Sequence, residues 1–205
     1  MGKIDFALNK YTEASHIKEK IGDLSGQATS LNNLAILYRQ RKNYQKASGT
    51  INNSLAITER IGEKKYLAVR YGNQASIYEA MGNFEEVLQG YKKALMIEES
   101  QQNLQGVAQQ YINIGGIQGD LGNYEKKIEN YSKALTILEK LDIKTDIANA
   151  LNNLGIAYYK HKKNHAKAIE LLQKALTIFK ELNHPQMIFN VSKTLDYIRK
   201  EFEFS

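Results

Sequence analysis

A motif rich in asparagine recurs every forty residues along the chain. Asn33, Asn73, Asn113 and Asn153 stand at this spacing, within the similar stretches LNNLAILY, YGNQASIY, YINIGGIQ and LNNLGIAY. Self-similarity at a fixed period of this length is typical of stacked supersecondary units, each of which buries its apolar face against its neighbours. The sequence therefore predicts one elongated array of repeats instead of one or two globular domains.

Apolar residues inside one unit follow the period of an α-helix. In the first full unit the spacings i, i+3, i+4 and i+7 are filled by Leu31, Leu34, Ala35 and Tyr38. A second helical pattern begins at Tyr44, carries Ala47, Ile51, Leu55 and Ile57, and ends near Gly62. The chain has a single Pro and no alternating β pattern, so we predict an all-α fold built from antiparallel helix pairs.

Short turns recur in the same register between the two helices of a pair. They fall at Lys42-Asn43, Gly82-Asn83 and Gly122-Asn123, where Gly and Asn tolerate the left-handed backbone that a tight connection needs. The fourth unit carries one extra residue, within KHKKNH at positions 160–165. This segment is the most basic in the chain, and we interpret it as a solvated turn in preference to a phosphate site.

Composition excludes several classes of protein. The absence of Cys rules out disulfides and thiolate metal sites. No run approaches the roughly twenty apolar residues of a membrane helix, and the N-terminus lacks the apolar core of a signal peptide, so we expect a cytoplasmic protein without a membrane partner. The 28 basic and 22 acidic residues give a charge of +6, but they are scattered, so we expect no nucleic-acid partner.

The two helical patterns together resemble the tetratricopeptide repeat. That family's first helix has a bulky residue, Leu, a small residue and Tyr, and its second helix has a small residue, an aromatic residue and Ala. The fourth unit fills these places with Leu151, Leu154, Gly155, Tyr158, Ala168, Leu172 and Ala175. The family's usual period is 34 residues, so this chain is similar to the longer variety of kinesin light chains and bacterial regulators. Departures are Gln74, Gln118 and Lys127.

The resemblance implies a right-handed α-solenoid that spans residues 1–205. We assign a lone half-repeat helix to residues 1–22 and a capping helix to 185–201, with full repeats at 26–62, 66–102, 106–142 and 146–183. The first segment aligns only with the second-helix half of a unit, from which we expect that the chain was excised from a longer array. Self-association through such an open repeat end is one hypothesis for its function.

The functional prediction concerns the side of each first helix that lies opposite the apolar stripe. In tetratricopeptide arrays this helix lines a concave groove, so the resemblance implies a groove floored by successive first helices. The predicted peptide-binding residues are Thr29, Asn33, Ile36, Gln40, Asn73, Ser76, Gln109, Asn113, Gly116, Asn153, Ile156 and Lys160. Val69, Ala80, Asp120 and Asn149 complete the four sets.

A row of asparagines on an exposed helix face needs a reason, because Asn is a mediocre helix former. Its amide donates and accepts hydrogen bonds at once, which matches the main chain of an extended peptide. The alternative is that each Asn bonds to the neighbouring repeat or persists from duplication. Gly115 fills the family's small packing position, so the second glycine, Gly116, is the candidate pocket.

The sequence offers no support for catalysis or for a cofactor. It has no phosphate loop, no nucleophile with a base and no carboxylate pair outside the repeat pattern. His161 and His165 stand four apart but span the predicted turn, so packing explains them better than a metal site. We therefore predict a non-enzymatic scaffold with a protein or peptide ligand; the alternative is a peptide-sensing regulatory region of a larger signalling protein.

Overall fold

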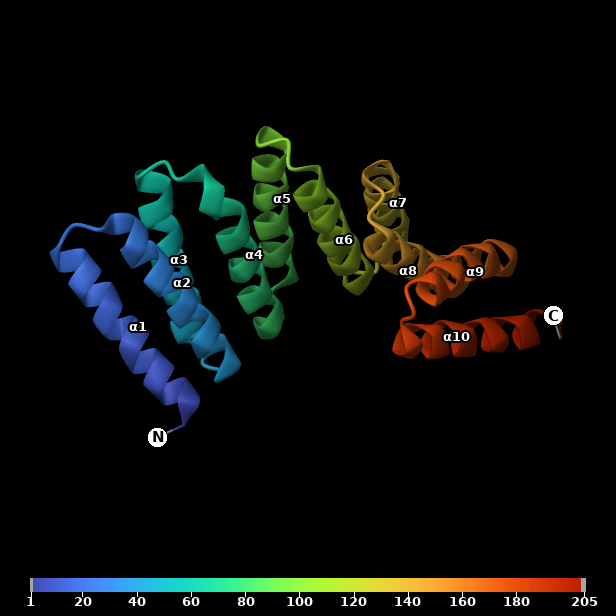
Figure 1. The fold of residues 1–205 in the computed structure, drawn as a ribbon, viewed down its shortest axis with the longest axis horizontal. Coiled ribbons are helices and arrows are strands. Elements are labelled where there is room, and N and C mark those ends of the chain that lie inside the picture. The colour runs from blue at the N-terminus through green and yellow to red at the C-terminus, as the bar shows by residue number, and fades with distance from the viewer. Residues whose placement is uncertain (1, 204–205) are drawn as a thin grey trace. The chain divides into compact units, whose positions relative to one another are not determined.

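The computed structural model describes residues 2–203, and within them it is built entirely from α-helices. The prediction of an all-α fold of antiparallel helix pairs is confirmed (Figure 1). The helices are α1 (Lys3–Lys20), α2 (Leu24–Gln40), α3 (Tyr44–Arg60), α4 (Lys64–Met81), α5 (Phe84–Ser100), α6 (Leu104–Asp120), α7 (Tyr124–Leu141), α8 (Lys144–Lys162), α9 (His165–Glu181) and α10 (Pro185–Glu203).

The chain divides into two compact units, each with its own core. Unit 1 is Met1–Gln102 and holds α1 to α5, and unit 2 is Asn103–Ser205 and holds α6 to α10. Within each unit every helix packs on the next one in the chain, and α2 also packs on α4. The continuous stacking of all four repeats in a single array stays a prediction.

Each turn between helices is made by one residue in the left-handed region. The residues that connect the two helices of a pair are Lys42, Gly82, Gly122 and Lys163, with φ of 59°, 78°, 78° and 47°. Those that connect successive pairs are Gly22, Gly62, Gln102, Asp142 and Asn183. At the predicted turns Asn therefore does not take the left-handed conformation itself; Asn43, for example, is the N-cap of α3 and accepts from the Lys46 amide at 3.3 Å.

The extra residue of the fourth unit lengthens a helix. α8 continues through Lys162, so only residues 163–164 lie between it and α9. The interpretation of the whole KHKKNH segment as a turn is wrong, because His161 belongs to the last turn of α8 and its ring stacks on Tyr124 at 3.5 Å. His165 packs on the rings of Tyr159 and Phe202, at centroid distances of 5.7 and 5.6 Å.

The small residue of each first helix lets its partner helix approach closely. Ala35, Ala75, Gly115 and Gly155 are all buried. A Cβ atom on Gly115 would lie 2.8 Å from the Tyr131 ring, closer than carbon atoms can pack, whereas one on Gly116 would find only the Tyr131 hydroxyl at 4.0 Å. The packing role predicted for Gly115 is therefore confirmed, and Gly116 has free space beside it.

The departures from the family pattern are accommodated locally. Gln118 is buried, and its side-chain oxygen Oε1 accepts from Asn123 Nδ2 at 2.9 Å, which satisfies a polar group where Tyr is expected. The Lys127 side chain runs past Gly119, where a Cβ would lie 2.7 Å from it, and its ammonium lies 5.8 Å from the centre of the Tyr131 ring. Glycine at position 119 thus makes room for lysine at position 127.

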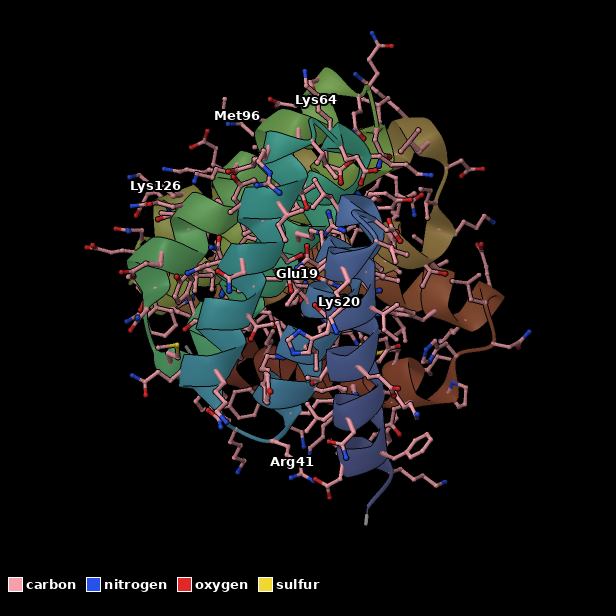
Figure 2. All side chains as sticks on the ribbon, turned by 90° about the vertical axis from the view of Figure 1, so that its left-hand side faces the viewer. Glu19, Lys20, Arg41, Lys64, Met96 and Lys126 are labelled. Carbon is pink, nitrogen blue, oxygen red and sulfur yellow. The ribbon has the colours of Figure 1, made fainter. Side chains whose placement is uncertain are left out.

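The terminal helices each leave one side uncovered by the described residues. Tyr11 of α1 is 36% exposed, whereas Ile51, at the same position of α3, is fully buried. Arg41, at the end of α2, forms an ion pair with Asp5 of α1, and Figure 2 shows Arg41 at that end of the unit. At the other terminus α10 buries Val191, Leu195 and Ile198 as it packs on α9.

Candidate peptide-binding face

The four repeated asparagines lie on the first helix of each pair, outside the core. α2, α4, α6 and α8 carry one each, and all four side chains are half-buried. The remaining predicted residues are half-buried or exposed as well, so none of the predicted face is in the core. Helical periodicity therefore identified a surface correctly, while its role in binding stays a prediction.

In unit 1 a chain of amides connects α2 with α4. The Asn32 side chain donates to Asn33 Oδ1 at 3.4 Å and accepts from Asn73 Nδ2 at 2.8 Å. Asn73 thus spends one donor on the neighbouring repeat, which is the structural role considered as the alternative. The side-chain nitrogen of Asn33, Nδ2, donates no hydrogen bond within residues 2–203, so it stays available to a ligand.

Two more of the predicted residues in unit 1 are held by arginines. The Ser76 hydroxyl accepts from the Arg39 guanidinium, so its oxygen is already engaged within unit 1. Thr29 donates to the Ser25 carbonyl at 3.0 Å and accepts from Arg70 Nη2 at 3.2 Å. Ile36 is half-buried and Gln40 is exposed.

Arg70 is a buried cation that joins three helices of unit 1. Its side chain is only 3% exposed, donates to Thr58 of α3 and Thr29 of α2, and lies 5.3 Å from the Tyr66 ring centre. Burial lowers the pKa of Arg70, and the negative charge of Glu63 partly offsets this effect. The guanidinium fixes the position of Thr29, and with it this end of the face.

Among the described residues of unit 2, neither repeated asparagine bonds to a neighbouring helix. Asn113 accepts from Gln109 at 3.0 Å and donates to Gln110 at 3.4 Å, both on α6. Asn153 makes no side-chain hydrogen bond within the described residues, so its donor and acceptor are both free. Ile156 is half-buried beside it, and Lys160 is exposed.

Lys160 borders a hollow of about 630 Å³ formed by α8, α9 and α10. Its other lining residues are Tyr159, Lys163, His165, Tyr197 and Glu201. The Tyr159 hydroxyl donates to Glu201, which raises the tyrosine pKa, and the Tyr159 ring meets that of Tyr197 edge-on at 6.2 Å. The predicted face therefore ends, near Lys160, at a hollow lined by aromatic and charged side chains.

Sequence reasoning missed Asn32, Arg70 and Tyr197. Asn32 had a signal, since the doubled asparagine of LNNL occurs at both 32–33 and 152–153. Tyr197 stands forty-one residues after Ile156, the offset that the inserted residue gives to the fourth unit. Arg70 had none, because the same repeat position holds Ser30, Gln110 and Ala150, which share no chemistry.

The face carries side-chain amides together with the apolar side chains of Ile36 and Ile156. Within residues 2–203, no group of three or more His, Cys, Asp or Glu side chains could hold a metal ion. No helix among these residues is long and apolar enough to cross a membrane.

The stacked helix pairs, with a small residue at each crossing, define the chain as an array of helical repeats. The family model for the tetratricopeptide repeat matches residues 26–99 and 106–181. The chain belongs to the tetratricopeptide repeat family, whose members generally serve as scaffolds for protein interaction. Comparison with curated proteins gives no match.

Solved structures with the same fold include three of different kinds. A putative kinesin light chain with repeats from Podosopora anserina is 16% identical with a TM-score of 0.75, covering 89% of this chain and 90% of that one. The tetratricopeptide-sensor STAND ATPase PH0952 from Pyrococcus horikoshii is 21% identical with a TM-score of 0.77. The match covers 87% of this chain and 30% of that one. A Rap protein complexed with Competence and Sporulation Factor is 19% identical with a TM-score of 0.65. The match covers 97% of this chain and 60% of that one. At these identities the likeness concerns the fold.

Proposed function

We propose that this chain is a non-enzymatic scaffold that holds an extended segment of a partner protein along its first helices. The observation that carries the proposal is the asparagine row: four side chains at one repeat position, none of them in the core. A primary amide pairs with both the C=O and the N–H of a peptide main chain, so such a row binds backbone without selecting side chains. Asn153 and the Asn33 nitrogen are the atoms freest to do so.

Selectivity for the partner comes from the positions between the asparagines. Ile36 and Ile156 offer apolar contacts, and the space beside Gly116 admits a side chain that any larger residue would exclude. Ser76 and Thr29 contribute a fixed polar surface, because Arg39 and Arg70 hold their hydroxyl oxygens. Gln109 orients Asn113 through its hydrogen bond, and Lys160 brings a positive charge to one end.

The test is peptide selection from a random library on the intact chain, followed by fluorescence anisotropy with the selected peptide. Asn33→Ala, Asn113→Ala and Asn153→Ala should each weaken binding by about 0.5–1.5 kcal/mol, the worth of one hydrogen bond. The matched control is Asn53→Ala, an exposed asparagine on the second helix α3, which should leave affinity unchanged. Equal binding by all variants would contradict the proposal, as would loss of helical circular dichroism in the three face variants.

A second candidate function is peptide sensing within a larger signalling protein. It is supported by the Rap complex and by the STAND protein described as having a repeat sensor, of whose chains this one spans 60% and 30%. In this case bound peptide must favour one conformation of the repeats over another. Small-angle X-ray scattering with and without the selected peptide tests this, and identical profiles at saturation would count against sensing.

A further inference from the structure

A second hollow in unit 2 lies away from the asparagine row, between the second helices α7 and α9. Its volume is about 650 Å³, it is open to solvent, and α8 forms its floor. The apolar lining consists of Leu135, Ile147, Leu151, Leu154, Leu171 and Ile178. Ser132, Glu139, Tyr158, Lys167, Lys174 and Thr177 complete it. We call this hollow the α7–α9 trough.

The equivalent positions in unit 1 are bridged by polar side chains. Tyr71 stands in place of Leu151, and its hydroxyl donates to Glu59 of α3. Gln74 stands in place of Leu154 and donates to Asn52 of α3 at 2.7 Å. The Lys93 ammonium of α5 lies 5.0 Å from the Tyr71 ring centre. Unit 1 thus ties its three helices together by polar contacts at positions where unit 2 has the buried leucines Leu151 and Leu154.

The two ends of the α7–α9 trough carry opposite charge. Lys167 and Tyr158 lie at the end where α8 connects to α9, and Glu139 lies at the end where α7 connects to α8. Lys167 and Lys174 share a single carboxylate, Glu170, at 2.9 and 2.8 Å. Glu139 also lies close enough to raise the pKa of Lys174, so Lys167 is the positive group at its end of the α7–α9 trough and favours an acidic group there.

The dimensions and the wall chemistry favour a helical occupant. Lys167 and Ile178 span eleven residues of α9, which corresponds to about 16 Å or three helical turns. The wall hydroxyls already give their protons to their own helices, Ser132 to the Ile128 carbonyl and Thr177 to the Gln173 carbonyl. An extended peptide would find few donors for its carbonyls here, whereas a helix satisfies its own backbone.

We propose that the α7–α9 trough binds an amphipathic helix of a partner protein, about three turns long. Its apolar stripe packs on Leu135 of α7 and Ile178 of α9, which are half-buried. An acidic residue in its first turn meets Lys167, and a basic residue in its last turn meets Glu139. This arrangement also complements the dipole of the bound helix, which therefore runs parallel to α9.

The probe for this site is a fluorescein-labelled synthetic helix with leucines at i, i+3, i+4 and i+7, Glu in the first turn and Lys in the last. A second probe exchanges the Glu and Lys residues. The first variant of the whole chain is Ser132→Asn, Leu151→Tyr, Leu154→Gln, which transplants the polar bridges of unit 1 onto residues beside the existing Glu139. Fluorescence anisotropy should show binding at least about tenfold weaker than that of the intact chain.

A surface variant keeps the proposal testable if the triple variant fails to fold. Lys167→Glu changes no core residue, and it should weaken the first probe and strengthen the charge-exchanged one. The Asn33, Asn73, Asn113, Asn153→Ala variant should bind the first probe as the intact chain does, which separates this site from the asparagine row. Equal binding of both probes to the intact and Lys167→Glu chains would overturn the proposal, as would undiminished binding by a folded triple variant.

Discussion

Two adjacent glycines in α6 should respond to the same substitution with opposite signs. Gly115 faces the Tyr131 ring, where an added Cβ would lie 2.8 Å from two ring carbons, and Gly116 faces open space. Each is interior to the helix, where Gly→Ala gains about 1 kcal/mol from helix propensity. At Gly116 this gain is unopposed, so Gly116→Ala should stabilise the protein by up to about 1 kcal/mol.

At Gly115 the same gain competes with overpacking. The 2.8 Å contacts are made with a ring that is itself only 6% exposed, so the tyrosine cannot simply swing into solvent. Inserting a carbon into a packed core costs about 1–3 kcal/mol. Since the propensity gain is common to both variants, the difference between their stabilities isolates this packing cost and should equal about 1–3 kcal/mol.

Urea denaturation followed by far-ultraviolet circular dichroism measures the free energy of unfolding of both variants. The dependence of that free energy on urea concentration must be the same in both for the midpoints to be compared. A third variant, Gly115→Ala with Tyr131→Ile, imports the pair that Ala35 and Ile51 form at the same positions of unit 1, and it should recover much of the loss. Equal effects of the two single substitutions would refute the packing argument. So would a double variant that is no more stable than Gly115→Ala alone.

Three further predictions concern buried charge, capping and pH. Arg70→Ala should cost about 3 kcal/mol in urea denaturation because it removes two charge-assisted hydrogen bonds, whereas Arg60→Ala, on the exposed side of α3, should change stability by less than about 0.5 kcal/mol. Asn43→Ala removes an N-cap whose side chain accepts a hydrogen bond at 3.3 Å, and it should lower the free energy of unfolding by about 1 kcal/mol. Asn83→Ala should cost less, because Asn83 makes no capping hydrogen bond. A lower melting temperature for Asn83→Ala than for Asn43→Ala would contradict this. Hydrogen bonds from Lys174 and Lys167 lower the Glu170 pKa from 4.5 to about 2, so this carboxylate stabilises the fold above pH 4.5 and loses that effect as pH falls through about 2. Carbon-13 NMR titration should place the Glu170 midpoint near 2 and move it upward in Lys174→Ala, and a midpoint that ignores the substitution would contradict the assignment.

Sequence periodicity predicted the helices because every unit repeats the same apolar stripes followed by the same turn positions. The forty-residue spacing located the first-helix face, and the small residue at Gly115 was assigned correctly, since both follow from helix geometry alone. Hydrogen bonds between repeats were not predictable in this way. Long side chains such as those of Arg39 and Arg70 bond to residues of other helices. Their partners depend on the distances between helices, which the spacing of residues along the sequence does not give.

The α7–α9 trough was beyond sequence reasoning for a different reason. Tyr71 and Leu151 occupy the same position of the repeat pattern, where any bulky residue satisfies the packing rule. Whether that residue bridges to the preceding helix depends on its polar tip, because unit 2 has Glu139 and Lys174 at the positions of Glu59 and Lys93. A pattern that treats tyrosine and leucine as equivalent discards this distinction.

The packing of each helix on its chain neighbours has a consequence for how the protein acquires its structure. Within each unit, nearly all tertiary contacts join segments that are adjacent along the chain, and the α2–α4 contact skips only one helix. Few long loops must close before contacts form, so the entropic barrier to folding is small and folding should be fast. Any adjacent helix pair can serve as the first folded segment, and structure can then spread to its neighbours in either direction.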